Sequence, residues 1–277
     1  MNRTILAFMA VALMACANNR PVAVAPAPSP APASVLAEDP ASELAQYGYD
    51  AVLWQHASAE AYRLQQQGYE LARIRLAENL KVTDERPPAV IVDIDETVLD
   101  NSPYQVDLAS KGAIYDQATW LKWTNAAQAS AVPGAVAFLK EAQAKGCTIF
   151  YITNRDVRER ASTLKNLDSL AFPFADTDHL LLMEGTSDKT ERRARVVNSH
   201  HVVLLVGDQL RDFDERFKDR SVGNGKATVD AFADTLSRYF VLLPNPMYGT
   251  YRDAVQGKGT DAEKQGNVKN WFRNNAH

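Results

Sequence analysis

The chain has 277 residues, of which 46% are hydrophobic and 23% are charged, and its formal net charge is -4. This composition is ordinary for a globular protein with one large domain or two smaller ones, and the small acidic excess argues against binding to nucleic-acid polymers, whose partners carry basic surfaces. The only cysteines are Cys16 and Cys147, too few for a secreted domain stapled by disulfides.

The first 15 residues have the features of a secretion signal. Arg3 is their only charged residue, and residues 5–15 form an apolar run that is short for a membrane span. The run leads into LMAC, which resembles the signal of a bacterial lipoprotein, in which Cys16 carries the lipid and becomes the mature N-terminus. The alternative is an ordinary signal peptide in which Cys16 is incidental.

Residues 16–37 are rich in proline and alanine and lack apolar periodicity, which favours an extended tether. The folded domain should then occupy residues 38–277. Ala17 follows Cys16, where bacterial lipoproteins of the inner membrane commonly have aspartate. The expected location is therefore the bacterial cell envelope, with the lipid in the outer membrane.

Residues 40–81 have a helical pattern, and Ser58 is a suitable N-cap for the longer helix. Gly68 lowers the helix propensity near the middle, and Pro87 with Pro88 ends the pattern. The apolar residues that recur at steps of three and four are Leu64, Leu71, Ala72, Ile74, Leu76 and Leu80.

Five apolar runs predict buried strands, and helical segments separate most of them. Strands that alternate with helices of this length predict an α/β fold, with a parallel sheet flanked by helices on both faces. Cys147, at the start of the second run, is interpreted as a core residue. The runs are residues 89–95, 147–153, 179–183, 201–208 and 239–245, and the helical segments are residues 133–145, 156–170, 188–198 and 229–238.

Residues 100–132 break the alternation between the first and second strands. They are rich in aromatic residues, and we expect them to form a cap insertion over one edge of the sheet. The aromatic residues are Tyr104, Tyr115, Trp120 and Trp123.

Polar residues stand where the predicted strands end. In open parallel sheets, ligands bind beyond the carboxyl ends of the strands, so we expect these residues to gather at one edge. They are Asp93, Asp95 and Glu96 after the first strand, Thr153, Asn154 and Arg155 after the second, Lys189 after residues 179–183, and Asp208 with Asp212 after residues 201–208.

The chemistry of these residues predicts a site for a metal and a phosphate group. Asp93, Asp95 and Asp208 offer hard oxygen ligands without histidine or cysteine, which suits Mg²⁺. Thr153 and Lys189 add a hydroxyl donor and a cation. Alternate residues of a strand point to the same side, so Asp93 and Asp95 could face one bound group together.

Six motifs between residues 54 and 251 resemble, in order, those of the haloacid dehalogenase (HAD) phosphohydrolases. More closely, they resemble the class C acid phosphatases, the lipoprotein e group of bacterial outer-membrane nucleotidases. The resemblance implies a HAD-like Rossmannoid fold with a helical N-terminal segment and a cap insertion after the first strand. The motifs are VDIDETVLDNSPYQ, AVPGAVAFL, FYITNR, SDKTERR, VGDQLRDF and LPNPMYG.

The resemblance also implies catalytic roles for two of the aspartates. Asp93 would attack phosphorus and form an aspartyl-phosphate. Asp95 would protonate the departing alkoxide and then accept a proton from the attacking water. By the same resemblance, Mg²⁺ would be held by Asp93, Asp208, Asp212 and the main-chain carbonyl of Asp95, and the phosphate by Thr153, Asn154 and Lys189.

Aromatic residues are expected to choose the substrate. The resemblance places the nucleobase between Trp120 and Tyr248, whereas Trp123 is more simply explained as packing. Tyr251 stands where the group often has tryptophan. The preference among nucleotides, and between nucleotides and aryl phosphates, therefore stays open.

The prediction that follows is a lipid-anchored, Mg²⁺-dependent phosphomonoesterase that hydrolyses nucleoside monophosphates and other small esters, as an acid phosphatase or 5′-nucleotidase. Two alternatives remain open: a surface lipoprotein that binds a small ligand without turnover, and a phosphotransferase that uses the same intermediate. Dimers are common in the group, so a homodimer is compatible with the resemblance.

Two predictions concern arginines. Arg192, Arg193 and Arg195 are expected to form a solvated helix face. Arg155 is equally compatible with a phosphate contact and with a structural ion pair.

Overall fold

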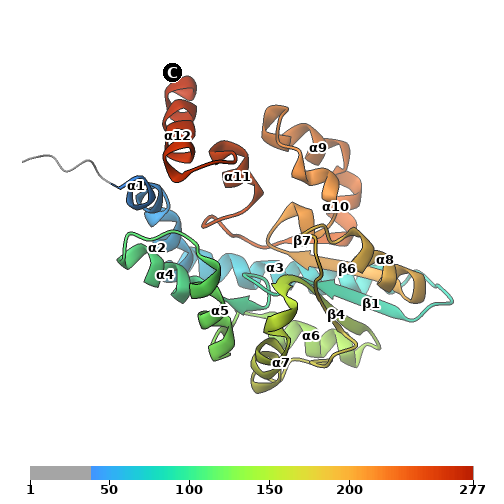
Figure 1. Cartoon of the computed structure of the whole chain (residues 1–277). Helices are drawn as coiled ribbons and strands as arrows, with labels where there is room; N and C mark the ends of the chain where they lie inside the picture. Colours follow the sequence, from blue (N-terminus) through green and yellow to red (C-terminus); the bar gives the residue numbers. More distant parts are fainter. Residues whose placement is uncertain (1–38, 277) are drawn as a thin grey trace, which may run out of the picture. The chain divides into compact units, whose positions relative to one another are not determined.

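Five parallel strands form the central sheet of the protein, which a computed structural model describes over residues 39–276 (Figure 1). The predicted α/β fold with a parallel sheet is confirmed. The predicted signal peptide, Cys16 and the tether lie outside the described residues. In spatial order the strands are β5 (Leu180–Met183), β4 (Thr148–Asp156), β1 (Pro88–Val92), β6 (His201–Gly207) and β7 (Phe240–Leu242).

The order of the strands creates a switch point beside β1. From β1 the chain passes to β4 and β5 on one side, and then crosses to β6 and β7 on the other. Ile91 of β1 is in register with Phe150 of β4 and with Leu205 of β6. Ligands of open parallel sheets bind beyond the carboxyl ends of the strands at such a reversal.

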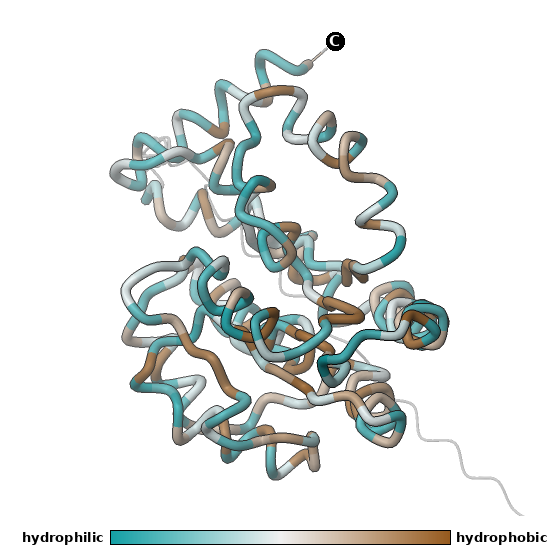
Figure 2. The backbone as a smooth tube through the Cα atoms, turned by 90° about the vertical axis from the view of Figure 1, so that its right-hand side faces the viewer, coloured by the Kyte–Doolittle hydropathy of each residue, from teal (hydrophilic) through white to brown (hydrophobic). Residues whose placement is uncertain are grey.

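Alternate residues of the central strands pack into two separate cores. Val90 and Val92 of β1 belong to the larger core, whereas Ala89 and Ile91 belong to the smaller one. Since both faces of the sheet are covered, the strands read as nearly continuous apolar runs in the sequence. Figure 2 shows that apolar stretches (brown) lie mainly in the interior.

Helices cover both faces of the sheet. The larger core receives side chains from α3 (Ala59–Asn79), α6 (Ala135–Ala144) and α7 (Arg160–Ser169). The smaller core receives Val196 of α8 (Thr190–Ser199) and Leu236 of α10 (Ala233–Tyr239). The segment predicted as one helix over residues 229–238 is divided, because α9 (Lys226–Ala231) ends before α10 begins.

The remaining helices are short or belong to the two ends of the described chain. None of the helices between residues 39 and 276 is both long enough and apolar enough to cross a membrane. Apart from two helices of the insertion after β1, they are α1 (Pro40–Gln46), α2 (Tyr49–Ala57), α11 (Thr250–Gln256) and α12 (Asp261–Asn275). Short 3₁₀ turns occur at Val157–Glu159, Leu210–Asp212, Glu215–Lys218 and Gly223–Gly225.

Helix α3 begins where the sequence indicated, since the Ser58 hydroxyl accepts a hydrogen bond from the Ala61 amide at 2.9 Å. The buried face differs from the apolar pattern, however, because Leu64, Leu71 and Ile74 are exposed. The face that packs on the sheet is instead Ala61, Gln65, Tyr69, Ala72 and Leu76. The periodicity therefore predicted the helix correctly and its buried side only in part, since Ala72 and Leu76 are buried.

The insertion after β1 contains α4 (Ser102–Ser110) and α5 (Gln117–Ala126). A two-residue antiparallel pair, β2 (Leu99–Asp100) with β3 (Ser130–Ala131), joins its two ends. The Trp123 indole donates to Asn101 Oδ1 at 2.8 Å, which ties α5 to the start of the insertion. Trp123 thus has the packing role expected for it.

Gly68 allows α3 to lie close to the segment that follows β7. A Cβ at this position would overlap Leu243 Cδ2, and Leu243 is buried in the larger core. Gly68→Ala should therefore lower the free energy of unfolding by about 1 kcal/mol, because overpacking of about 1–3 kcal/mol outweighs a helix-propensity gain of about 0.5–1 kcal/mol. Urea denaturation of residues 35–277 measures the change.

Gly266 of α12 provides the matched control, because a Cβ there would meet no atom within 4 Å. Gly266→Ala should raise the free energy of unfolding by about 0.5–1 kcal/mol. Equal stabilisation by both substitutions would mean that Leu243 can move aside and that the close approach is no constraint.

Candidate active site

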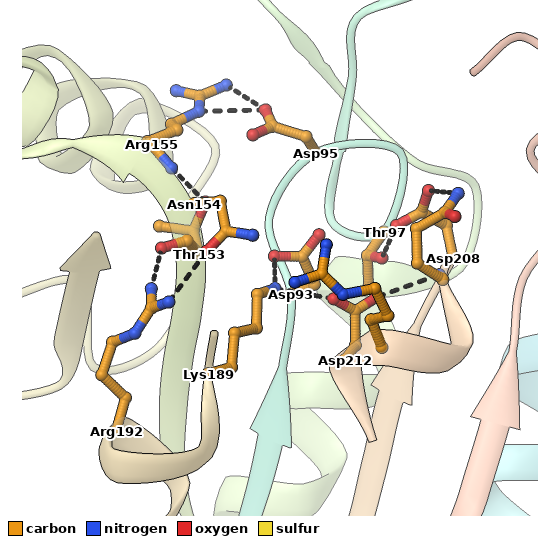
Figure 3. A network of polar contacts seen from close by, with 12 residues as sticks. Asp93, Asp95, Thr97, Thr153, Asn154, Arg155, Lys189, Arg192, Asp208 and Asp212 are labelled. Atoms are coloured by element: carbon orange, nitrogen blue, oxygen red, sulfur yellow. Dashed lines mark hydrogen bonds and ion pairs between the residues drawn. The ribbon is translucent and has the colours of Figure 1, made fainter. Parts of the chain in front are cut away.

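Three carboxylates meet at the carboxyl edge of the sheet, at the switch point between β1 and β6 (Figure 3). Asp93 follows β1, Asp208 follows β6, and Asp212 ends the 3₁₀ turn after β6. One oxygen of each carboxylate lies within 4.8 Å of the others. The sheet thus joins residues that are more than a hundred positions apart in the sequence.

Lys189, immediately before α8, is the one cation in contact with this group among residues 39–276. Its Nζ lies 2.5 Å from Asp93 Oδ1 and 2.7 Å from Asp212 Oδ1. One ammonium group against three largely buried carboxylates leaves an excess of negative charge, which is unfavourable unless another cation compensates it. The donor set of carboxylate oxygens without nitrogen or sulfur fits a hard divalent cation such as Mg²⁺.

The pKa values of the carboxyl groups reflect the same crowding. Burial raises the pKa of Asp93 well above its ordinary value, with Lys189 opposing the shift and Asp212 and Asp208 adding to it. Burial, and then the negative charge of Asp212, raises the pKa of Asp208 to about 7. A divalent cation among these groups would favour their ionised forms.

Neighbouring residues hold Asp208 and Asp212 in place. Asn245 Nδ2 and Gln209 Nε2 donate to Asp208 Oδ2 at 2.7 and 3.0 Å, and the Gln209 amide donates to Asp212 Oδ2 at 2.9 Å. A Cβ on Gly207 would lie 2.5 Å from Asp212 Oδ2. The glycine of the GDQLRDF motif therefore leaves the space into which Asp212 folds back.

Sequence reasoning gave no role to Gln209 or Asn245. Asn245 belongs to the LPNPMYG motif, which was singled out only for Tyr248. The available signal is that Asn245 is the polar residue at the end of the predicted strand 239–245, as Asp208 is at the end of residues 201–208.

The residues predicted to bind phosphate lie beside the carboxylates at the end of β4. Asn154 lines the same cavity as Asp93 and Lys189, and Thr153 is fully buried. The Thr153 hydroxyl accepts a hydrogen bond from the Arg155 amide at 3.1 Å. The structure brings these residues together, and their contact with a phosphate group stays a prediction.

The prediction of a solvated arginine face on α8 is wrong for Arg192 and Arg193, which are only 6% and 9% exposed. It is right for Arg195, which is exposed. Arg192 donates to the Thr153 carbonyl at 2.5 Å and to Asn154 Oδ1 at 2.8 Å, so it supports the end of β4. Arg193 donates to the Asp212 carbonyl at 3.1 Å. The buried Val196, four residues after Arg192, was the signal that this face is turned inward.

Asp95 is separate from the three carboxylates. Because β1 ends at Val92, strand alternation does not position Asp93 and Asp95, but both side chains line the same cavity, as expected. The Asp95 carboxylate pairs with Arg155, whose Nη2 lies 2.8 Å from Oδ1, and both side chains are drawn in Figure 3. Of the two interpretations of Arg155, the structure supports the ion pair.

A cavity of about 530 Å³ opens over the carboxylates. Asp93, Asp95 and Lys189 line one part of it, and Trp120 of α5 and Tyr248 line another. The Trp120 ring packs edge-on against Tyr104, with centroids 5.2 Å apart at 72°. The two aromatic residues predicted to hold a nucleobase therefore share one cavity with the predicted nucleophile, whereas the side chain of Tyr251 is partly exposed.

Comparison with known proteins identifies relatives of the whole folded part. A family model described as HAD superfamily, subfamily IIIB (acid phosphatase) matches residues 23–251. The class C acid phosphatase from Bacillus anthracis is 34% identical in sequence, with a TM-score of 0.78, over 86% of this chain and 99% of that chain. The structure of that enzyme with tungstate bound has the same identity and TM-score, over 85% of this chain and 98% of that one.

A plant protein is also similar. Acid phosphatase 1 from Solanum lycopersicum is 30% identical over 173 residues, which are 62% of this chain. The chain spans 63% of the length of this curated relative.

The raised pKa of Asp208 predicts how stability depends on pH in the metal-free protein. A carboxyl group whose pKa is raised by folding stabilises the fold fully below its ordinary pKa, near 4, and this contribution is lost as the pH rises through the folded value, about 7. As the pH rises from 5 to 8, the free energy of unfolding of wild type should fall by about 2–3 kcal/mol relative to that of Asp208→Asn, which lacks the titrating group.

Urea denaturation in EDTA across this pH range measures the difference, and a repeat in saturating Mg²⁺ should reduce it because the cation favours the ionised carboxylates. Parallel stability curves of the two proteins in EDTA would contradict the prediction.

Proposed function

Because this chain belongs to the acid phosphatases of HAD superfamily subfamily IIIB, a family of phosphoric monoester hydrolases, we propose that it hydrolyses nucleoside monophosphates and other small phosphate esters in a Mg²⁺-dependent reaction. The observation that carries the proposal is the cavity in which Asp93, Lys189 and the aspartate group adjoin Trp120 and Tyr248. It combines groups for phosphoryl transfer with an aromatic surface for the leaving group.

The proposed reaction has two steps. In the first, a carboxylate oxygen of Asp93 bonds to phosphorus, the bond to the leaving oxygen breaks, and Asp95 gives that oxygen a proton. In the second, water attacks the aspartyl-phosphate, Asp95 takes up its proton, and inorganic phosphate leaves with Asp93 restored. Lys189, whose Nζ lies 2.5 Å from Asp93 Oδ1, would neutralise charge on the phosphoryl oxygens.

The metal has a supporting role in this proposal. Asp93, Asp208, Asp212 and the Asp95 carbonyl would hold Mg²⁺, which supplies positive charge next to the phosphoryl group. Thr153 and Asn154 would complete the phosphate site. The tungstate-bound relative supports the assignment of an oxyanion site, because tungstate is a tetrahedral oxyanion like phosphate.

The base of a nucleotide would stack between Trp120 and Tyr248. Stacking on an aromatic side chain contributes about 1–3 kcal/mol per base and tolerates different bases. We therefore expect a broad range of nucleoside monophosphates rather than a single one.

Phosphate release tests the proposal directly. Residues 35–277 with Mg²⁺ should release phosphate from nucleoside monophosphates, and EDTA should abolish the release. Asp93→Asn should lower kcat by about 10³-fold or more, because no nucleophile remains. Trp120→Ala should raise KM for nucleotides by about 5-fold to 100-fold and leave KM for glycerol phosphate unchanged. Trp271→Ala is the control, because Trp271 does not line the cavity.

The outcomes separate the alternatives. Phosphate release that persists in Asp93→Asn would refute the assignment of Asp93 as the nucleophile. Folded, metal-loaded protein that releases phosphate from no ester would favour the binding lipoprotein. Transfer of the phosphoryl group to an added alcohol, detected by product analysis, would favour the phosphotransferase.

We also propose that the enzyme is anchored in the outer membrane by lipid on Cys16 and held away from it by residues 17–37. The supporting observations are the LMAC sequence and the proline- and alanine-rich tract. In a bacterial host, full-length protein should incorporate labelled palmitate and sediment with outer membranes, whereas Cys16→Ser should lose both. Palmitate-free protein secreted in soluble form would indicate an ordinary signal peptide.

A further inference from the structure

Arg155 is among the largest fully buried side chains of the protein and has only 2% of its surface exposed. Its guanidinium donates twice to Asp95, with Nε and Nη2 at 2.9 and 2.8 Å from the same oxygen, Oδ1. Because both N–H groups belong to one rigid, planar guanidinium, the two hydrogen bonds fix the position of Oδ1. Arg155 thus anchors one of the two oxygens of the Asp95 carboxyl group.

The two oxygens of Asp95 have different surroundings. Oδ1 accepts a third hydrogen bond, from Asn101 Nδ2 at 2.9 Å, so three donors converge on it. Oδ2 accepts no hydrogen bond from any residue between 39 and 276. The Asp95 side chain lines the cavity and is 18% exposed. When the carboxyl group is protonated, its proton must therefore be on Oδ2, the oxygen available to a substrate.

Arg155 is itself held from other sides. Its Nη1 donates to the Thr163 hydroxyl of α7 at 3.1 Å, and its guanidinium carbon lies 5.8 Å from the centre of the Trp120 ring, within cation–π distance. These contacts prevent the guanidinium from following Asp95 if that side chain rotates. The arginine is a fixed support rather than a mobile partner.

We propose that Arg155 is a positioning residue for the leaving-group step, which holds Asp95 so that Oδ2 meets the leaving oxygen of the substrate. This inference rests on the proposed function, since it assigns a purpose to Arg155 within that reaction. Arg155 does not touch the phosphoryl group in this proposal and acts only through Asp95.

The proposal has a chemical signature, because leaving groups differ in their need for a proton. As the bond between Asp93 and phosphorus forms and the bond to the leaving oxygen breaks, the proton on Asp95 Oδ2 moves to that oxygen, which yields a neutral alcohol and an Asp95 carboxylate. An alkoxide depends on this proton. A 4-nitrophenolate leaves without it, because the ring already stabilises its negative charge.

Benzyl phosphate and 4-nitrophenyl phosphate therefore test the proposal, since both carry one aromatic ring but differ in their leaving groups. In purified full-length protein with Mg²⁺, Arg155→Met should lower kcat/KM for benzyl phosphate by about 10²-fold and for 4-nitrophenyl phosphate by less than about 5-fold. Arg155→Lys keeps the charge but lacks the paired donors. It should lower kcat/KM by an intermediate factor, again more for benzyl phosphate than for 4-nitrophenyl phosphate.

Arg193→Met is the matched control, because Arg193 is also a buried arginine near the site but contacts no residue of the Asp95 network. It should lower kcat/KM for both esters by the same factor. Thermal melting of each variant reports whether it is folded. If Arg155→Met does not fold, the two esters are compared with Arg155→Lys instead.

A double-mutant cycle with Asp95→Asn completes the test. If Arg155 acts through Asp95, then Arg155→Met should cause no further loss in the Asp95→Asn background. Equal losses for the two esters, or losses that multiply in the double variant, would overturn the proposal. Wild type that hydrolyses neither ester would instead refute the proposed function itself.

Discussion

The site depends on the electrostatic imbalance at the end of β1 and β6, where three carboxylates face a single lysine inside a largely buried space. Such a group could not persist in a protein core without help, because unpaired buried charges are strongly unfavourable. The surroundings supply that help through Asn245, Gln209 and the space left at Gly207. The rigid parallel sheet holds these groups together despite their mutual repulsion.

Two buried arginines extend this organisation away from the carboxylates. Arg192 supports the end of β4 from the helix α8, and Arg155 supports Asp95 from β4 itself. Neither arginine lines the cavity, whereas Lys189 does. In the proposed reaction Lys189 is therefore the cation next to the phosphoryl group, and the two arginines support the residues around the cavity.

Much of the fold was predictable because both faces of the sheet are covered, which leaves unmistakable apolar runs. The grouping of Asp93 with Asp208 followed from the rule that strand ends share an edge. The orientation of Asp95 did not, because it depends on where β1 ends and on Arg155, sixty residues later. The burial of Arg192 and the inward face of α3 also escaped prediction, since hydrogen bonds to distant backbone and close packing at Gly68 decide them rather than local hydrophobicity.

The two-residue pair of β2 with β3 closes the insertion off from the central sheet at a narrow base. Leu99 lies opposite Ala131, so the insertion leaves and rejoins the domain at one place. Asn101, at the start of the insertion, contacts Asp95, whereas Trp120 lies further along the insertion, in α5. A change in the outer part of the insertion would therefore reach Asp95 as well as the proposed base site, because Trp120 also lies against Arg155.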